Sequence, residues 1–216
     1  MELFLNETLG KITYEVHDTP ISEAVLLIAH GAGTDLNHPF LKQLAEKIYD
    51  HGISVIRFNF PFMEKGKRPP TTPQDALTTW HKMIMEAIKL FHFQKIYIGG
   101  KSYGGRMASI LLAENSELAV NGVIYYGFPL HPPGKESKDR ATHLDKIKLP
   151  QLFIQGTNDK LAAFSLIEEV VKTISDASLI PVKEADHSFV RPKSKATISE
   201  TTDQIAEETA RWISKR

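Results

Sequence analysis

Residues 100–104 read GKSYG and place Ser102 in a G-x-S-x-G pattern, the arrangement in this chain with the clearest chemical use. The pattern directly follows an apolar run at residues 95–99 and directly precedes small and apolar residues from Gly105 onward. A strand, a sharp turn and a helix in that order form a nucleophile elbow, which exposes a serine hydroxyl above a sheet. Glycines suit the flanking positions because side chains there would meet the neighbouring strand and helix. The sequence therefore predicts that Ser102 is a nucleophile.

A base and an acid must accompany this serine, because a neutral hydroxyl attacks weakly until a base removes its proton. After an elbow of this kind the acid comes next in the chain and the histidine last. Of the nine histidines, only His187 follows the last predicted strand, so we expect it to be the base. Asp159 follows a predicted strand and a glycine, and we expect it to accept the Nδ1 proton of His187. Asp186, which adjoins the histidine, and Asp139, in a proline-rich segment, are weaker candidates for the acid.

Two N–H donors are needed to hold the negative charge that develops on a carbonyl oxygen under attack. The N–H of Tyr103, directly after the nucleophile, is the first candidate. The second is expected from the loop after the strand at residues 24–29, with Ala32 preferred over Gly33. His30, at the end of that strand, is expected to make structural hydrogen bonds.

Nucleotide-binding and metal-binding interpretations of the same chain fail. The GKS of residues 100–102 resembles the end of a phosphate-binding loop, but Lys95 stands where that motif needs its first glycine. Residues 31–36 begin like a dinucleotide fingerprint, but Leu36 replaces its third glycine. The histidines have no metal-ligand spacing, and the chain has no cysteine, which excludes disulfides and a cysteine nucleophile. We therefore expect no cofactor and no metal.

The overall composition predicts a single globular domain covering residues 1–216. Lysine and arginine number 26 and aspartate and glutamate 26, so there is no basic excess of the kind that binds nucleic acid. The first eleven residues lack the basic start and apolar centre of a signal peptide. The longest apolar run, at residues 24–29, is far short of the roughly 18 residues that suggest a membrane span. We expect a cytoplasmic protein with no membrane contact; the oligomeric state is not indicated.

Strand-like and helix-like segments alternate, which predicts an α/β fold: a mostly parallel central sheet with helices on both faces. A short antiparallel start is expected around residues 12–16. Further strands are expected at residues 24–29, 53–60, 95–99, 120–128, 151–155 and, more weakly, 179–184. Apolar residues at helical spacing predict helices at residues 40–48, 77–91, 166–174 and 198–213.

Two segments rich in proline and charge, residues 61–73 and 129–150, interrupt this alternation. Each follows a predicted strand, at the edge of the sheet where open α/β folds bind ligands. Both are therefore candidate walls of a pocket, which would suit a small hydrophobic acyl group. The alternative is that they are solvated connections, which we expect for most of their charged side chains. Lys101 and Arg106 flank the elbow, and we expect both to form ion pairs. The expected substrate-binding side chains are Phe62, Met63, Phe128 and His38.

Six short sequences together resemble a known family. They are residues 30–33 (HGAG), 38–40 (HPF), 57–61 (RFNFP), 99–106 (GGKSYGGR), 155–159 (QGTND) and 186–187 (DH). In this order they resemble the small dienelactone-hydrolase-like α/β-hydrolases, and among these the bacterial relatives of the testis-expressed α/β-hydrolase-like proteins. The resemblance runs from about residue 24 to the C-terminus and implies an α/β-hydrolase fold with a minimal cap. True dienelactone hydrolases carry cysteine at the elbow, where this chain has Ser102.

The hypothesis from the sequence is therefore a serine hydrolase that acts on a small-molecule ester, thioester or similar acyl bond through an acyl-serine intermediate. A peptidase is less favoured, because a short cap offers little to hold an extended peptide. The alternative is a catalytically silent binding or scaffold protein, since a fold alone does not establish a function.

Overall fold

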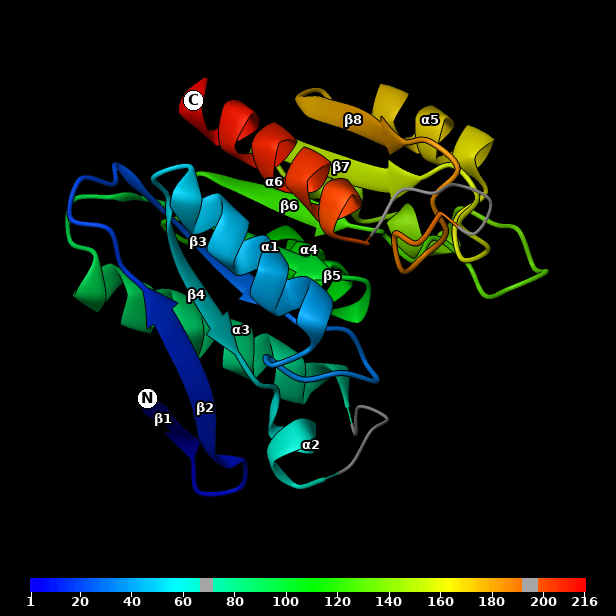
Figure 1. Ribbon diagram of the computed structural model, residues 1–216. Coiled ribbons are helices and arrows are strands. Elements are labelled where there is room, and N and C mark those ends of the chain that lie inside the picture. The colour runs from blue at the N-terminus through cyan, green and yellow to red at the C-terminus, as the bar shows by residue number, and fades with distance from the viewer. Residues whose placement is uncertain (67–71, 192–197) are drawn as a thin grey trace.

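The strands of the chain form one mixed sheet, shown in Figure 1, in the order β1-β2-β4-β3-β5-β6-β7-β8. The computed structural model describes residues 1–66, 72–191 and 198–216. Within these residues the strands are β1 Glu2–Asn6, β2 Gly10–His17, β3 Ala24–Ala29, β4 Ser54–Phe58, β5 Lys95–Lys101, β6 Gly122–Tyr126, β7 Gln151–Gly156 and β8 Ala177–Val182.

Strand β2 runs antiparallel to both β1 and β4, and the pairs from β4 through β3 and β5 to β8 are parallel. The predicted antiparallel start and mostly parallel sheet are therefore confirmed. Strand β3 is buried along its whole length, as its unbroken apolar run predicts. Because β3 lies between β4 and β5, the order of connection reverses there, and the carboxyl ends of β3 and β5 meet at a topological switch point.

Helices cover both faces of the sheet, as predicted. Helices α1 and α6 lie side by side on one face in Figure 1, and their apolar residues join one core cluster. Apolar residues of α3, α4 and α5 join the cluster on the other face. The described helices are α1 Pro39–Asp50, α2 Pro61–Glu64, α3 Pro73–Leu90, α4 Tyr103–Glu114, α5 Phe164–Lys172 and α6 Ile198–Ser214, with short 3-10 turns η1 Asp139–Ala141 and η2 Leu144–Lys146.

The bounds of several strands differ from the prediction; β4, for example, covers residues 54–58 of the expected 53–60. Strand β6 covers only residues 122–126 of the expected 120–128, because Gly127 takes a positive φ of 72° and turns the chain. Strand β8 lies two residues earlier than expected. It is a partly exposed edge strand containing Pro181, which an edge tolerates because one side needs no ladder hydrogen bond.

The two proline-rich segments contain short helical turns. Helix α2 occupies the start of residues 61–73, and positions 67–71 lie outside the described residues. Residues 129–150 contain η1 and η2 and run beside helix α4.

Candidate active site

Ser102 occupies a strained turn between β5 and α4, with φ 50° and ψ −111°. Such a backbone costs a non-glycine residue roughly 1–3 kcal/mol and persists only where the surroundings enforce it. The enforcing contacts are close. A Cβ at Gly100 would lie 2.4 Å from the nitrogen of Gly105, and one at Gly104 would lie 2.7 Å from the oxygen of His30. The prediction that side chains at the flanking positions Gly100 and Gly104 would clash with the neighbouring strand and helix is confirmed.

His187 reaches the serine from the loop after β8. Its Nε2 lies 2.9 Å from Ser102 Oγ, and the two residues are 85 positions apart in the chain. The loop is held by Asp186, whose Oδ1 accepts hydrogen bonds from the main-chain N–H groups of Ser188 and Val190. Asp186, a weaker candidate for the acid, therefore shapes the loop that presents the imidazole.

Asp159 contacts the other side of the imidazole. Its Oδ2 lies 2.7 Å from Nδ1 of His187, and its side chain is fully buried. Gln155 donates to the same oxygen at 2.6 Å, and the N–H of Leu161 donates to Oδ1 at 2.7 Å. Since a carboxylate only accepts, Nδ1 carries the imidazole proton and Nε2 is free to accept one from Ser102. The structure thus joins the three predicted residues in one hydrogen-bonded chain.

The protonation of His187 follows from its surroundings. Burial lowers the pKa of His187 below its ordinary value, while the hydrogen bond that His187 donates to Asp159 opposes this shift. The imidazole therefore stays neutral below the pH at which a free histidine would take up a proton. A neutral imidazole is the form that can accept a proton from a serine.

The expected N–H donors lie around the nucleophile. Tyr103 is the first residue of α4, and the first N–H groups of a helix have no carbonyl partner inside it. Residue Ala29 of β3 is in register with Gly100 of β5, so the loop after β3 starts beside the elbow. A Cβ at Gly31 would lie 3.9 Å from that of Ser102. Within the described part of the chain, no hydrogen bond engages the N–H of Ala32 or Gly33, which leaves both available to a ligand.

His30 has the structural role expected of it. Its Nδ1 lies 2.7 Å from the oxygen of Gly31, and its Nε2 accepts a hydrogen bond from the N–H of Phe60 at 2.9 Å. Burial lowers the pKa of His30 to about 4. The neutral ring therefore links the loop after β3 to the chain leaving β4.

A small pocket of about 190 Å³ opens beside Ser102 and His187. The predicted residues Gly33 and His38 line it, and His38 is exposed at the N-terminus of α1 without capping the helix through its side chain. The sequence did not predict several of the residues that line this pocket. Phe40, for example, has the apolar spacing of a residue on the core face of a helix. The full lining is Gly31, Gly33, Thr34, His38, Phe40, Leu41, Lys101, Ser102, His187 and Ser188.

Phe62, Met63 and Phe128, three of the expected substrate-binding side chains, do not line this pocket. Phe62 is 4% exposed and packs against the rings of His30 and Tyr103. Phe128 is 1% exposed and packs against Tyr125. Met63 is partly buried against the same core cluster. These apolar side chains follow strand ends but turn inward, where they lose contact with water.

The expected ion pairs beside the elbow are also wrong. Lys101 donates a hydrogen bond to the main-chain oxygen of His187, at 2.5 Å, and forms no direct ion pair within the described residues. The pKa of Arg106 is lowered first by burial and second by the like charge of Arg140.

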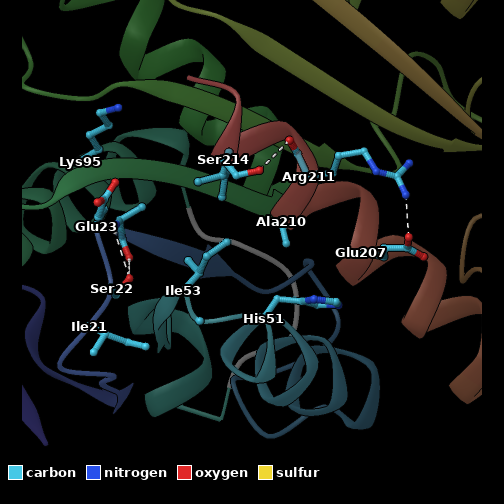
Figure 2. Close-up of a pocket in the computed structure, with 13 residues that line it drawn as sticks. Ile21, Ser22, Glu23, His51, Ile53, Lys95, Glu207, Ala210, Arg211 and Ser214 are labelled. Atoms are coloured by element: carbon cyan, nitrogen blue, oxygen red, sulfur yellow. Dashed lines mark hydrogen bonds and ion pairs between the residues drawn. The ribbon is translucent and has the colours of Figure 1, made fainter.

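A larger cavity, of about 580 Å³ and drawn in Figure 2, lies at the amino-terminal ends of strands β3 and β5. It borders Ala24 and Lys95, the first residues of β3 and β5, whereas Ser102 follows the last residue of β5. Figure 2 shows Arg211 of α6 paired with Glu207 on one side of this cavity. The hydrogen-bonded chain of Ser102 therefore lies beside the smaller pocket of about 190 Å³ and not in this larger cavity.

The described residues contain no cluster of histidine and acidic side chains suited to hold a metal ion. Among the helices that the structure describes, none combines the length and the apolar character that crossing a bilayer requires.

Solved structures of similar fold support this architecture. An alpha-beta serine hydrolase homologue from Coxiella burnetii aligns with a TM-score of 0.77 and 17% identity over 99% of this chain and 97% of its own. A dienelactone hydrolase from Anabaena variabilis aligns with a TM-score of 0.77 and 16% identity over 99% and 95%. A Xanthomonas campestris protein described as an a/b serine hydrolase without lid aligns with a TM-score of 0.72 and 16% identity over 98% and 94%. At these identities the likeness establishes the fold.

The sequence itself identifies the family. A family model described as an alpha/beta hydrolase domain matches residues 22–214, which include every strand from β3 to β8 and all of the described helices. The chain therefore belongs to the α/β-hydrolase family.

Proposed function

We propose that this chain is a serine hydrolase that cleaves an ester, thioester or similar acyl bond of a small molecule through an acyl-Ser102 intermediate. The observation that carries the proposal is the unbroken contact from Ser102 Oγ to His187 Nε2, 2.9 Å, and from His187 Nδ1 to Asp159 Oδ2, 2.7 Å. A nucleophile, a base and an orienting acid at these distances are the arrangement that acyl transfer requires.

In the first half of the proposed reaction, Ser102 Oγ attacks the carbonyl carbon and its proton passes to Nε2 of His187. Asp159 stabilises the imidazolium that forms. The negative charge on the former carbonyl oxygen is held by the N–H of Tyr103 and by that of Ala32 or Gly33, each worth roughly 2.7–4 kcal/mol of barrier. The intermediate then expels the alcohol or thiol, which leaves with the proton from His187.

In the second half, His187 removes a proton from a water molecule, and the resulting hydroxide attacks the acyl carbon. Collapse of this second intermediate breaks the bond to Ser102, whose oxygen regains the proton from His187. The carboxylic acid is released and the chain returns to its starting state. A pocket of about 190 Å³ beside Ser102 suits a short acyl group.

Labelling with a fluorophosphonate probe tests the proposal without knowledge of the natural substrate. We expect the probe to modify Ser102 and the Ser102→Ala variant to stay unlabelled, with hydrolysis of p-nitrophenyl acetate reduced by roughly 10⁴-fold or more. Ser188→Ala is the matched control, because it removes the other serine hydroxyl that lines the pocket, and it should still be labelled. A folded wild-type protein that is neither labelled nor active would instead favour a silent binding protein.

A further inference from the structure

Lys101 places a positive charge beside the site, and the proposed reaction does not use this charge. It is the last residue of β5 and directly precedes the nucleophile. Side chains alternate between the faces of a strand, so Lys101 shares a face with Tyr97, which belongs to the core cluster beneath α1 and α6. The loop of His187 lies on that same face, where Phe189 joins the cluster.

The Nζ of Lys101 has a specific set of neighbours. It donates a hydrogen bond to the main-chain oxygen of His187, at 2.5 Å, and lies 5.1 Å from the centre of the Phe189 ring. A Cβ at Gly127 would lie 3.0 Å from Nζ and 3.5 Å from the same oxygen, so glycine leaves room for this contact. Lys101 therefore links the strand before the nucleophile to the loop that presents the base.

We propose that Lys101 is a positioning residue for the base: it anchors the main chain of His187 to the nucleophile's strand and keeps a positive charge beside the imidazole. This inference rests on the proposed roles of Ser102 and His187. Anchoring the carbonyl of His187 to the residue next to Ser102 fixes the approach of Nε2 to Oγ. The positive charge disfavours a second positive charge on the ring, so the resting imidazole stays neutral and ready to accept a proton.

The charges that face His187 set the strength of this effect. Asp159, from the turn after β7, and Asp186, from the same loop, favour the imidazolium, whereas burial and Lys101 disfavour it. Among the described residues that line the pocket, His38 is a further ionisable group. Lys101 thus lowers the pKa of His187. Burial lowers the pKa of Lys101 itself to about 8, opposed by Asp159 and Asp186, so the positive charge persists through neutral pH.

The test is the pH dependence of kcat/KM for p-nitrophenyl acetate in Lys101→Met, which keeps the length of the side chain and removes its charge and donors. We expect the acid-side midpoint to rise by roughly one pH unit, so that kcat/KM on the acid side of the midpoint falls roughly tenfold. Lys101→Arg, which keeps the charge, should keep the wild-type midpoint. Lys160→Met is the matched control: it removes an exposed lysine next to Asp159, where solvent screens the charge, and should leave the profile unchanged.

If folded Lys101→Met has the same acid-side midpoint as the wild type, the proposal is overturned and Lys101 has only a structural role. Lys101→Gln, which keeps a donor without the charge, takes its place if the methionine variant does not fold.

The imidazole titration of His187, followed by NMR in a Ser102→Ala background, separates this inference from the proposed hydrolase activity. It should move to higher pH when Lys101 is replaced by methionine, whether or not any ester is turned over. An unmoved titration would refute the role of Lys101, whereas a wild-type protein without turnover would refute only the proposed function.

Discussion

The carboxylate of Asp159 is held by donors on both oxygens, so its orientation toward His187 is fixed before any substrate arrives. Gln155 and the imidazole share Oδ2, and the N–H of Leu161 binds Oδ1. Rotation of the carboxylate would break these bonds inside the protein, where an unpaired polar group costs about 1–3 kcal/mol. The choice of tautomer for the base is thus settled by residues on the far side of the ring from the nucleophile.

Asp159→Asn tests this orientation. The amide group offers a donor toward Nδ1 and favours the tautomer in which Nε2 carries the proton and cannot accept one from Ser102. We expect kcat to fall by roughly 10³–10⁴-fold with an unchanged circular dichroism spectrum. Asp139→Asn, an exposed carboxylate in η1, is the control, and an equal loss of kcat there would contradict the assignment of the acid.

At the scale of elements, the elbow depends on how closely β5, α4 and the end of β3 approach one another. A Cβ at Gly104 would lie 2.7 Å from the oxygen of His30 and 2.8 Å from that of Ala29, both main-chain atoms that cannot move aside cheaply. The serine is therefore lifted into its strained turn by contacts between three elements, and its own residue type contributes little to that conformation.

Gly104→Ala should consequently lower the free energy of unfolding by about 3 kcal/mol, the upper end of the range for overpacked sites. Urea unfolding followed by fluorescence measures the change. Gly33→Ala is the matched control, because a Cβ there meets nothing within 4 Å, and its unfolding midpoint should match that of the wild type. Equal stability of both variants would show that the elbow relaxes around a methyl group.

The elements that the sequence predicted best are those with the strongest local pattern. Strand β3 is apolar throughout, and β5 and β7 each contain three consecutive large apolar residues. The spacing of the elbow glycines indicates that strand and helix approach each other closely there. Strand β8 was misplaced by two residues because a half-exposed edge strand has a weak apolar signal. Phe62 and Phe128, which the sequence predicts as lining a pocket, turn into the core, because their direction depends on packing between distant segments.

At the scale of the whole molecule, stability is linked to pH through buried histidines. Burial lowers the pKa of His30 and of His143 to about 4, well below that of an unfolded histidine. Between about pH 4 and the ordinary histidine value, the unfolded chain therefore binds more protons than the folded one. The contribution of these two histidines to the free energy of unfolding is therefore fully present above that window and is lost as the pH falls through it.

The free energy of unfolding should thus be lower at pH 5 than at pH 7, with His30 contributing about 2 kcal/mol of the difference. Urea unfolding at the two pH values measures it, and His30→Gln should shrink the difference by that amount. His81→Gln, at an exposed position of α3, should leave it unchanged. A pH difference that survives intact in His30→Gln would place its origin elsewhere.

His187, the proposed base, lies in the loop directly after β8, which is an edge strand of the sheet and, within the described residues, pairs only with β7. The nucleophile, in contrast, follows β5, which has neighbours on both sides. The proposed base and the proposed nucleophile thus differ in how firmly the sheet holds the strand before them. Local unfolding of this edge strand would separate His187 from the Ser102 hydroxyl while the central strands stayed folded. Turnover would therefore be lost before the protein unfolds globally.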